Sequence, residues 1–266
     1  MRKVLLLLLG FVIIAMPFDA LAGDCGDVNN DGAVDILDII YLIDYKFKGG
    51  PDPDCGETGT VTDIDGNVYQ TIKIGEQWWM VENLKVTHYR NGDPITHAPD
   101  NGAWGGITVG AFCNYDNNED HVAAYGRLYN WYAVDDSRNI APEGWHVPTD
   151  EEWKQLEINL GMSLAEAIAD GWRGTDEGGK LKEAGTAHWV SPNDGATNES
   201  GLTALPGGYR YGSGFFYKLG EEGSFWSSTV YDSYSGWFHS VSYNSPQIFR
   251  SIGALENGYS VRCVRD

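Results

Sequence analysis

The fold of this chain is decided by the stretch Pro142-Glu143-Gly144-Trp145-His146-Val147-Pro148-Thr149-Asp150-Glu151-Glu152-Trp153. Its second half has the pattern of a helix start, because Thr149 can cap a helix and Glu152, three residues later, can close a capping box. Apolar residues then recur at Trp153, Leu156 and Leu160, the spacing of one helix face. The sequence therefore predicts a helix that begins after Thr149 and buries this face.

Strands are expected on both sides of this helix. Toward the N-terminus, turn residues separate three β-rich runs, at residues 61–64, 68–74 and 77–81. Toward the C-terminus, residues 209–264 read as aromatic strands punctuated by glycines. A second capping box, at Ser163 and Glu166, predicts one more helix start. The pattern indicates an α+β domain with short strands, few helices and long loops.

Longer motifs in the same region give a family resemblance. Besides the stretch above they are GRLYNWYAV (126–134), LPGGYR (205–210), FWSS (225–228) and SVRCVRD (260–266). Together they resemble the Fibrobacter succinogenes major paralogous domain over nearly all of residues 60–266. The resemblance implies a C-type-lectin-like fold, related to the sulfatase-modifying-factor domains, and it implies no particular activity.

A smaller module is expected before this domain, and its centre is a calcium loop. Residues 27–38, DVNNDGAVDILD, place oxygen donors at the ligand positions of an EF-hand loop and a glycine at the sixth position. The predicted Ca²⁺ ligands are Asp27, Asn29, Asp31, Ala33 through its carbonyl, Asp35 through a water, and Asp38. The alternative is an acidic turn that binds no metal. Aspartate at the last position, followed by an apolar helix, resembles a dockerin repeat, whose family role is docking onto a cohesin module.

The helix after the calcium loop carries apolar side chains on more than one face over residues 36–47. Dockerins pair two repeats so that each helix covers the other, and this sequence holds one repeat. The uncovered side chains must then pack on the larger domain, on a second copy of the chain or on a partner. We expect either self-association or a cohesin-like partner at this helix.

The N-terminus is typical of an export signal. Arg2 and Lys3 precede an apolar run at residues 4–16, and a small-residue cleavage site follows at residues 20–22. No later segment has the apolar length of a membrane span. The expected organisation is therefore a signal peptide at 1–22, the dockerin-like module at 23–57 and the C-type-lectin-like domain at 58–266, in a protein secreted to the periplasm, the cell surface or the medium.

Four cysteines in an exported chain predict two disulfides, for which three pairings exist. Cys25 and Cys55 bracket the calcium module, so a bond between them would tie the ends of the module together. By elimination, Cys113–Cys263 is the expected second bond. The alternative is four free, buried thiols.

Composition and motifs narrow the function classes. A formal net charge of −20 makes nucleic acid and anionic membranes poor partners. The six histidines show no zinc-ligand spacing, and no nucleophile elbow or carboxylate-pair motif stands out. Two functions remain: a secreted, non-catalytic binding or adhesion protein, and a carbohydrate-active component that docks into a polysaccharide-degrading assembly. The missing catalytic motif favours the first.

A ligand, either a glycan or a surface protein, is expected on the aromatic loops of the C-terminal half. Glycines permit turns throughout residues 209–237, and C-type-lectin-like domains generally present ligands on loops of this half. Trp226 and Trp237 are expected in the core, and the alternative is that all these rings are packed inside. The predicted ligand-binding residues are Tyr211, Phe216, Tyr217, Tyr231 and Tyr234.

Overall fold

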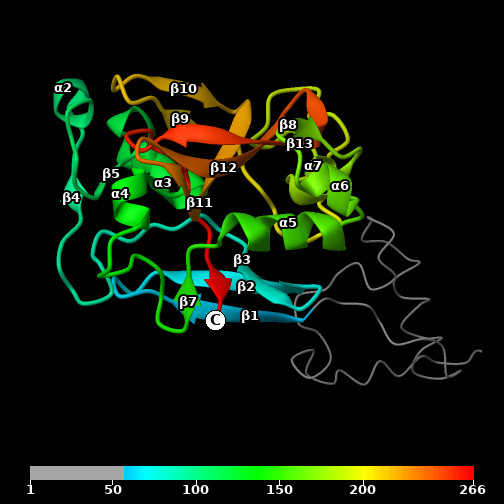
Figure 1. Cartoon of the computed structure of the whole chain (residues 1–266), viewed down its shortest axis with the longest axis horizontal. Coiled ribbons are helices and arrows are strands. Elements are labelled where there is room, and N and C mark those ends of the chain that lie inside the picture. Colours follow the sequence, from blue (N-terminus) through cyan, green and yellow to red (C-terminus); the bar gives the residue numbers. More distant parts are fainter. Residues whose placement is uncertain (1–56) are drawn as a thin grey trace, which may run out of the picture. The chain divides into compact units, whose positions relative to one another are not determined.

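The computed structural model describes residues 57–266, which belong to the second of two units into which the chain divides between Cys55 and Gly56. These residues form mixed α and β structure with more strand than helix (Figure 1). The strands are β1 (Thr58–Thr62), β2 (Val68–Ile74), β3 (Gln77–Met80), β4 (Thr96–His97), β5 (Ala111–Cys113), β6 (Leu128–Tyr129), β7 (Trp145–His146), β8 (Gly171–Arg173), β9 (Gly207–Arg210), β10 (Phe216–Leu219), β11 (Glu222–Asp232), β12 (Ser235–Ser242), β13 (Ser245–Ala254) and β14 (Val264–Arg265).

The helices are short, and most of them are single turns. They are α2 (Asn101–Trp104), α3 (Val122–Tyr125), α4 (Trp131–Val134), α5 (Asp150–Asn159), α6 (Leu164–Ala167) and α7 (Glu177–Leu181), with 3-10 turns at Tyr115–Asn117 and Glu119–His121. None of the helices described for residues 57–266 is long and apolar enough to cross a membrane.

The strands form three sheets. One has five strands in the order β1-β2-β3-β14-β7, one has six in the order β10-β9-β11-β12-β13-β8, and a small one has the order β4-β5-β6. The three β-rich runs expected at residues 61–81 are confirmed as β1, β2 and β3, which pair antiparallel in that order. The first strand ends at Thr62 because the Asp63 carboxylate accepts hydrogen bonds from the backbone N–H groups of Asp65 and Asn67, which turns the chain.

Helix α5 begins where the sequence predicts. The Thr149 hydroxyl accepts a hydrogen bond from the N–H of Glu152 at 3.2 Å, and the Glu152 carboxylate accepts one from the N–H of Thr149 at 2.8 Å, which completes the capping box. The same arrangement starts α6 at Ser163 and Glu166. On α5, Trp153 and Leu156 are buried as expected. Both helix starts are therefore set by local side-chain chemistry.

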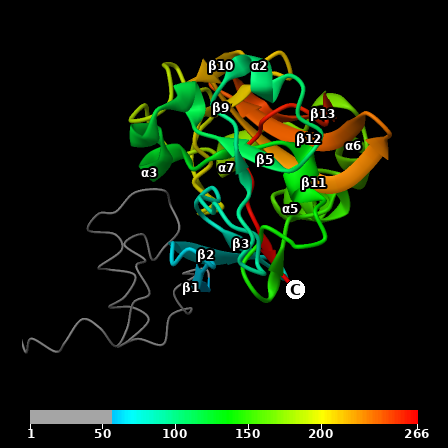
Figure 2. The same ribbon diagram turned by 90° about the vertical axis from the view of Figure 1, so that its left-hand side faces the viewer.

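Helix α5 lies between the five-stranded and six-stranded sheets, as both views show (Figures 1 and 2). The Trp153 ring contacts both sheets, with centroid distances of 4.8 Å to Trp79 on β3 and 5.7 Å to Phe225 on β11. The far face of the six-stranded sheet packs a second core around Trp226, Phe238 and Tyr259. The six-stranded sheet is thus covered on both faces, which fixes the strands that carry the candidate sites.

Candidate functional sites

Five ionisable side chains meet where α5 packs on the six-stranded sheet. Glu157 and Asp150 are seven residues apart, about two turns, so α5 presents both carboxylates on one face. His239 on β12 lies between them, with Nδ1 2.7 Å from Glu157 Oε1 and Nε2 3.1 Å from Asp150 Oδ1. Arg173 on β8 binds Glu157 at 2.8 Å, and Arg250 on β13 binds both oxygens of Asp150, at 2.7 and 2.8 Å. We call these five residues the charge cluster.

The charge cluster is buried, and both of its carboxylates are paired with arginines. All five side chains belong to residues that are at most 5% exposed. Burial by itself would raise the pKa of Asp150, but hydrogen bonds and charge interactions with His239 and Arg250 outweigh it and hold this pKa well below its ordinary value. A buried carboxylate with both oxygens engaged by basic side chains is poorly placed to meet a substrate. The cluster's chemistry is therefore that of a buried clamp between α5 and the sheet.

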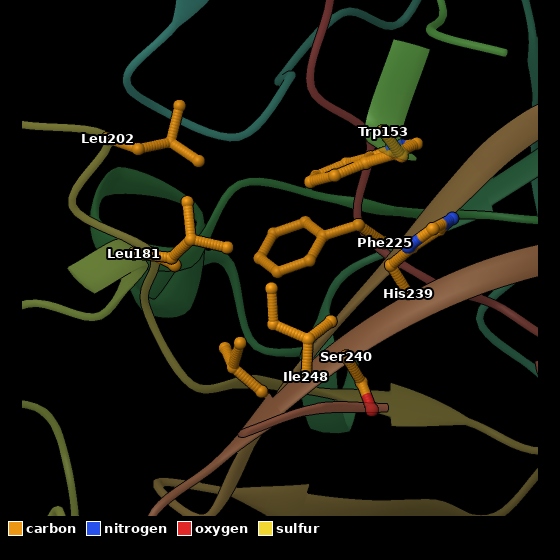
Figure 3. Close-up of a pocket in the computed structure, with 9 residues that line it drawn as sticks. Trp153, Leu181, Leu202, Phe225, His239, Ser240 and Ile248 are labelled. Atoms are coloured by element: carbon orange, nitrogen blue, oxygen red, sulfur yellow. The ribbon is translucent and has the colours of Figure 1, made fainter. Parts of the chain in front are cut away.

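A small cavity adjoins the charge cluster. Figure 3 shows Leu181, Leu202 and Ile248 facing the rings of Phe225 and Trp153, with His239 at the side. Its volume is about 10 Å³. A single water needs roughly this much room and also needs polar partners, whereas most of the side chains around this cavity are apolar. The cavity is a packing defect of the core, too small to admit a ligand.

Four of the five predicted ligand-binding residues are exposed. The exposed fractions are 54% for Tyr211, 45% for Tyr217, 54% for Tyr231 and 78% for Tyr234. Phe216 is partly buried, because its ring packs on Tyr115 at 5.2 Å and under the guanidinium of Arg210 at 4.6 Å. Of the two tryptophans expected in the core, Trp226 is fully buried, whereas Trp237 is half-buried under Arg250, whose guanidinium lies 3.6 Å from its ring centroid.

The exposed tyrosines do not gather on one surface. The ring centroids of Tyr231 and Trp237 lie 5.3 Å apart. The ring of Tyr217 instead contacts that of Tyr209. Tyr209 in turn contacts Tyr259, which packs on Phe238. Trp237 and Phe238 are successive residues of β12, so their side chains point to opposite faces of the sheet. Tyr217, on the β9–β10 hairpin, and Tyr231, near the end of β11, therefore belong to different faces of the sheet.

The β9–β10 hairpin carries a third exposed ring that the sequence reading missed. The N–H of Tyr211 donates to the carbonyl of Phe215 at 2.8 Å, and Tyr217 pairs with Tyr209 in register. Strand alternation then puts Tyr211, Phe215 and Tyr217 on the same side of the hairpin. Phe215 is 57% exposed. We call these three rings the hairpin aromatic surface.

A buried arginine holds this hairpin in place. Arg210 is fully buried and donates to the carbonyl of Gly214 at 2.9 Å, to that of Ala98 at 2.6 Å and to that of Pro99 at 3.0 Å. At the tip, the N–H of Gly212 donates to the side-chain oxygen of Asn257 at 2.9 Å. The exposed rings therefore stand on a backbone that is fixed from inside.

A comparison with protein-family models matches residues 72–265 to the Fibrobacter succinogenes major domain. The chain belongs to this family. The match begins within β2 and ends within β14, so the domain includes both the charge cluster and the hairpin aromatic surface. No curated protein and no solved structure matches this chain.

The Fibrobacter succinogenes major domain of this chain contains two free thiols, and the predicted Cys113–Cys263 disulfide is wrong. Cys113 packs with Trp104 in the small core cluster beside β5, whereas Cys263 belongs to the large cluster around Trp226. Burial raises the pKa of both thiols, that of Cys113 to about 12, so both stay protonated at neutral pH. Each thiol fills apolar space in its own cluster.

The remaining predictions lie outside the described residues. These are the signal peptide, the Cys25–Cys55 bond, the apolar helix 36–47 and the predicted calcium ligands Asp27, Asn29, Asp31, Ala33, Asp35 and Asp38. Within residues 57–266, no group of three or more His, Cys, Asp or Glu side chains is arranged to hold a metal ion.

Proposed function

We propose that this chain is a secreted, non-catalytic binding or adhesion protein, with a C-type-lectin-like domain at residues 58–266 that presents its ligand site on the hairpin aromatic surface. The observation that supports this function is the grouping of Tyr211, Phe215 and Tyr217, each about half exposed, on one side of a single hairpin. Aromatic rings exposed together on a surface are typical of sites that bind another macromolecule.

The support beneath the rings favours binding as well. Arg210 and Asn257 fix the hairpin backbone through buried or half-buried hydrogen bonds. Rings on a fixed backbone lose little conformational freedom when a partner binds, so more of the contact energy appears as affinity. None of the three rings lines a pocket described for residues 57–266, so the exposed arrangement suits a surface protein better than a small molecule, which would need a concave site.

The experiment is capture from a surface-protein extract of the source organism by the immobilised full-length protein, followed by binding measurements on the purified partner. We expect Tyr211→Ala and Tyr217→Ala each to weaken binding about tenfold or more. Tyr231→Ala is the matched control, because Tyr231 is as exposed as Tyr211 but belongs to the opposite sheet face. Unchanged binding in both hairpin variants would contradict the proposal.

A second function is favoured by one feature of the sequence, the calcium loop at residues 27–38. We propose as the alternative that the protein is a component of a polysaccharide-degrading assembly, docked through the dockerin-like module to a cohesin-like protein. Calcium-dependent complex formation with a purified cohesin module tests this alternative, because chelation of calcium should release the complex. Hydrolysis assays on plant polysaccharides separate a carbohydrate-active component from a binding protein.

A further inference from the structure

One face of the five-stranded sheet carries an open groove. The other face is covered by α5, and its residues Ile74 and Trp79 lie in the core with Trp153. All five strands contribute to the groove: β1 provides Gly59 and Thr60, and the other four strands provide Thr71, Trp78, Arg265 and Trp145. Register explains this, since Gly59 pairs with Thr71 and Arg265 pairs with Trp145, and directly paired residues share a face.

The size and position of the groove suit a small polar ligand. Its volume is about 360 Å³, within the range of roughly 300–1,000 Å³ that is typical of ligand sites. Glu143, in the turn before β7, completes the lining with an exposed carboxylate. Trp78 is half-buried, and the guanidinium of Arg265 lies 5.9 Å from its ring centroid. The groove therefore offers an aromatic ring with charged groups of both signs beside it.

Three polar side chains of the groove have no hydrogen-bond or ion-pair partner within residues 57–266. Neither the Glu143 carboxylate nor the Arg265 guanidinium forms a hydrogen bond or an ion pair with a described residue. The Thr71 side chain, which is 3% exposed, is also without a hydrogen bond in this part of the chain. Hydrogen-bond donors and acceptors that are free to bind a ligand, next to an accessible tryptophan ring, are typical of a binding site.

We propose that this groove binds a carbohydrate, specifically an oligosaccharide of neutral sugars. A pyranose ring has an apolar face that packs on an indole, and its hydroxyls both donate and accept hydrogen bonds. Glu143 accepts from such hydroxyls, Arg265 donates to them, and the Thr71 hydroxyl does both. One carboxylate and one guanidinium together leave no net charge in the groove, which matches a neutral ligand rather than an anion.

A glycine keeps the tryptophan accessible. A Cβ at Gly59 would lie 3.1 Å from Thr71 Oγ1 and 3.6 Å from Trp78 Cζ3, so any larger side chain on this residue would extend over the groove. Gly59→Leu thus blocks the groove without removing a single ligand-binding group. The backbone of Gly59 is ordinary strand, which accepts leucine without conformational strain.

The experiment titrates the full-length protein with cellohexaose, xylohexaose and chitohexaose, with calorimetry as the measurement. We expect at least one of these sugars to bind, Trp78→Ala and Gly59→Leu to weaken it about tenfold or more, and Glu143→Gln and Arg265→Ala to weaken it about fivefold each. Trp172→Ala is the matched control, because Trp172 is a 47% exposed tryptophan on β8, outside the groove, and its loss should leave affinity unchanged.

Binding of none of the three sugars overturns the proposal, and so does affinity that stays unchanged in Gly59→Leu, Glu143→Gln and Arg265→Ala. Glu143 and Arg265 are exposed, so their variants remain informative even if Trp78→Ala fails to fold. Tyr211→Ala should leave sugar binding intact whatever partner the hairpin aromatic surface binds. The outcome of the sugar-binding experiment is therefore independent of whether the hairpin aromatic surface binds a protein.

Discussion

Replacing Asp150 by asparagine tests whether the charge cluster clamps α5 to the six-stranded sheet. The substitution would keep the shape of the side chain but remove the charge that binds Arg250 at 2.7 and 2.8 Å. Breaking a buried ion pair by removing one partner costs about 3–5 kcal/mol. Asparagine still offers one oxygen, and Arg250 keeps a 2.6 Å contact with Asp170, so we expect a loss near the lower end, about 3 kcal/mol.

Urea unfolding followed by tryptophan fluorescence measures this loss. All ten tryptophans lie between Trp78 and Trp237, so the signal reports on the Fibrobacter succinogenes major domain alone. Asp170→Asn is the matched control: Asp170 binds the same arginine, but its side chain is 70% exposed, and exposed pairs contribute about 0–1 kcal/mol. If Asp150→Asn cost no more than Asp170→Asn, the clamp would be refuted.

The pH dependence gives an independent check on the same side chain. Because the pKa of Asp150 is lowered in the folded state, the unfolded chain binds more protons as the pH falls below the unfolded pKa, about 3.9. The stability from this carboxylate is thus fully present above about pH 5 and is lost as the pH falls toward the folded pKa. The free-energy difference between wild type and Asp150→Asn should stay constant from pH 7 to about pH 5 and shrink below about pH 4.

Three further predictions concern other parts of the chain. Arg210→Met leaves several buried carbonyls without a donor and should cost at least about 2 kcal/mol in the same urea assay, so an unchanged midpoint would contradict the role of Arg210. Without reductant, Cys113 and Cys263 should react with iodoacetamide only after unfolding, and recovery of a Cys113–Cys263 disulfide peptide would contradict this prediction. Asp27→Ala or Asp38→Ala should abolish calcium binding in calorimetry and leave tryptophan fluorescence unchanged; wild-type affinity in both variants would remove the calcium assignment.

The features that the sequence predicts well are those specified by neighbouring residues. The start of α5 depends on Thr149 and Glu152, which are three residues apart, and the first hairpin depends on the turn after Asp63. Such local chemistry can be read without knowing what packs nearby. Longer motifs predict membership of the Fibrobacter succinogenes major domain family, and the family match over residues 72–265 confirms this prediction.

The features that the sequence missed depend on pairing between distant strands. His239 meets Arg250 because β12 and β13 pair in that register, and nothing near either residue announces it. The prediction of a Cys113–Cys263 disulfide is wrong for a similar reason. The number of cysteines does not indicate which core cluster each cysteine packs in, and these two pack in different clusters. Tyr211 and Tyr231 are exposed, as the sequence predicts. They lie on different faces of the sheet, and this depends on the register in which the strands pair, which the sequence alone does not give.

Both proposed surfaces depend on α5, and this decides which variants are informative. Through the charge cluster α5 fixes the six-stranded sheet, from which the hairpin aromatic surface extends, and through the contact of Trp153 with Trp79 it fixes the sheet that carries the groove. A core variant such as Trp153→Ala would loosen both sheets, so lost binding there would say nothing about where a ligand sits. Exposed positions such as Tyr211 and Glu143 lie in loops next to different sheets, and their replacement leaves α5 intact. If the two sites are separate, a variant of Tyr211 should weaken protein binding and leave sugar binding unchanged. A variant of Glu143 should weaken sugar binding and leave protein binding unchanged.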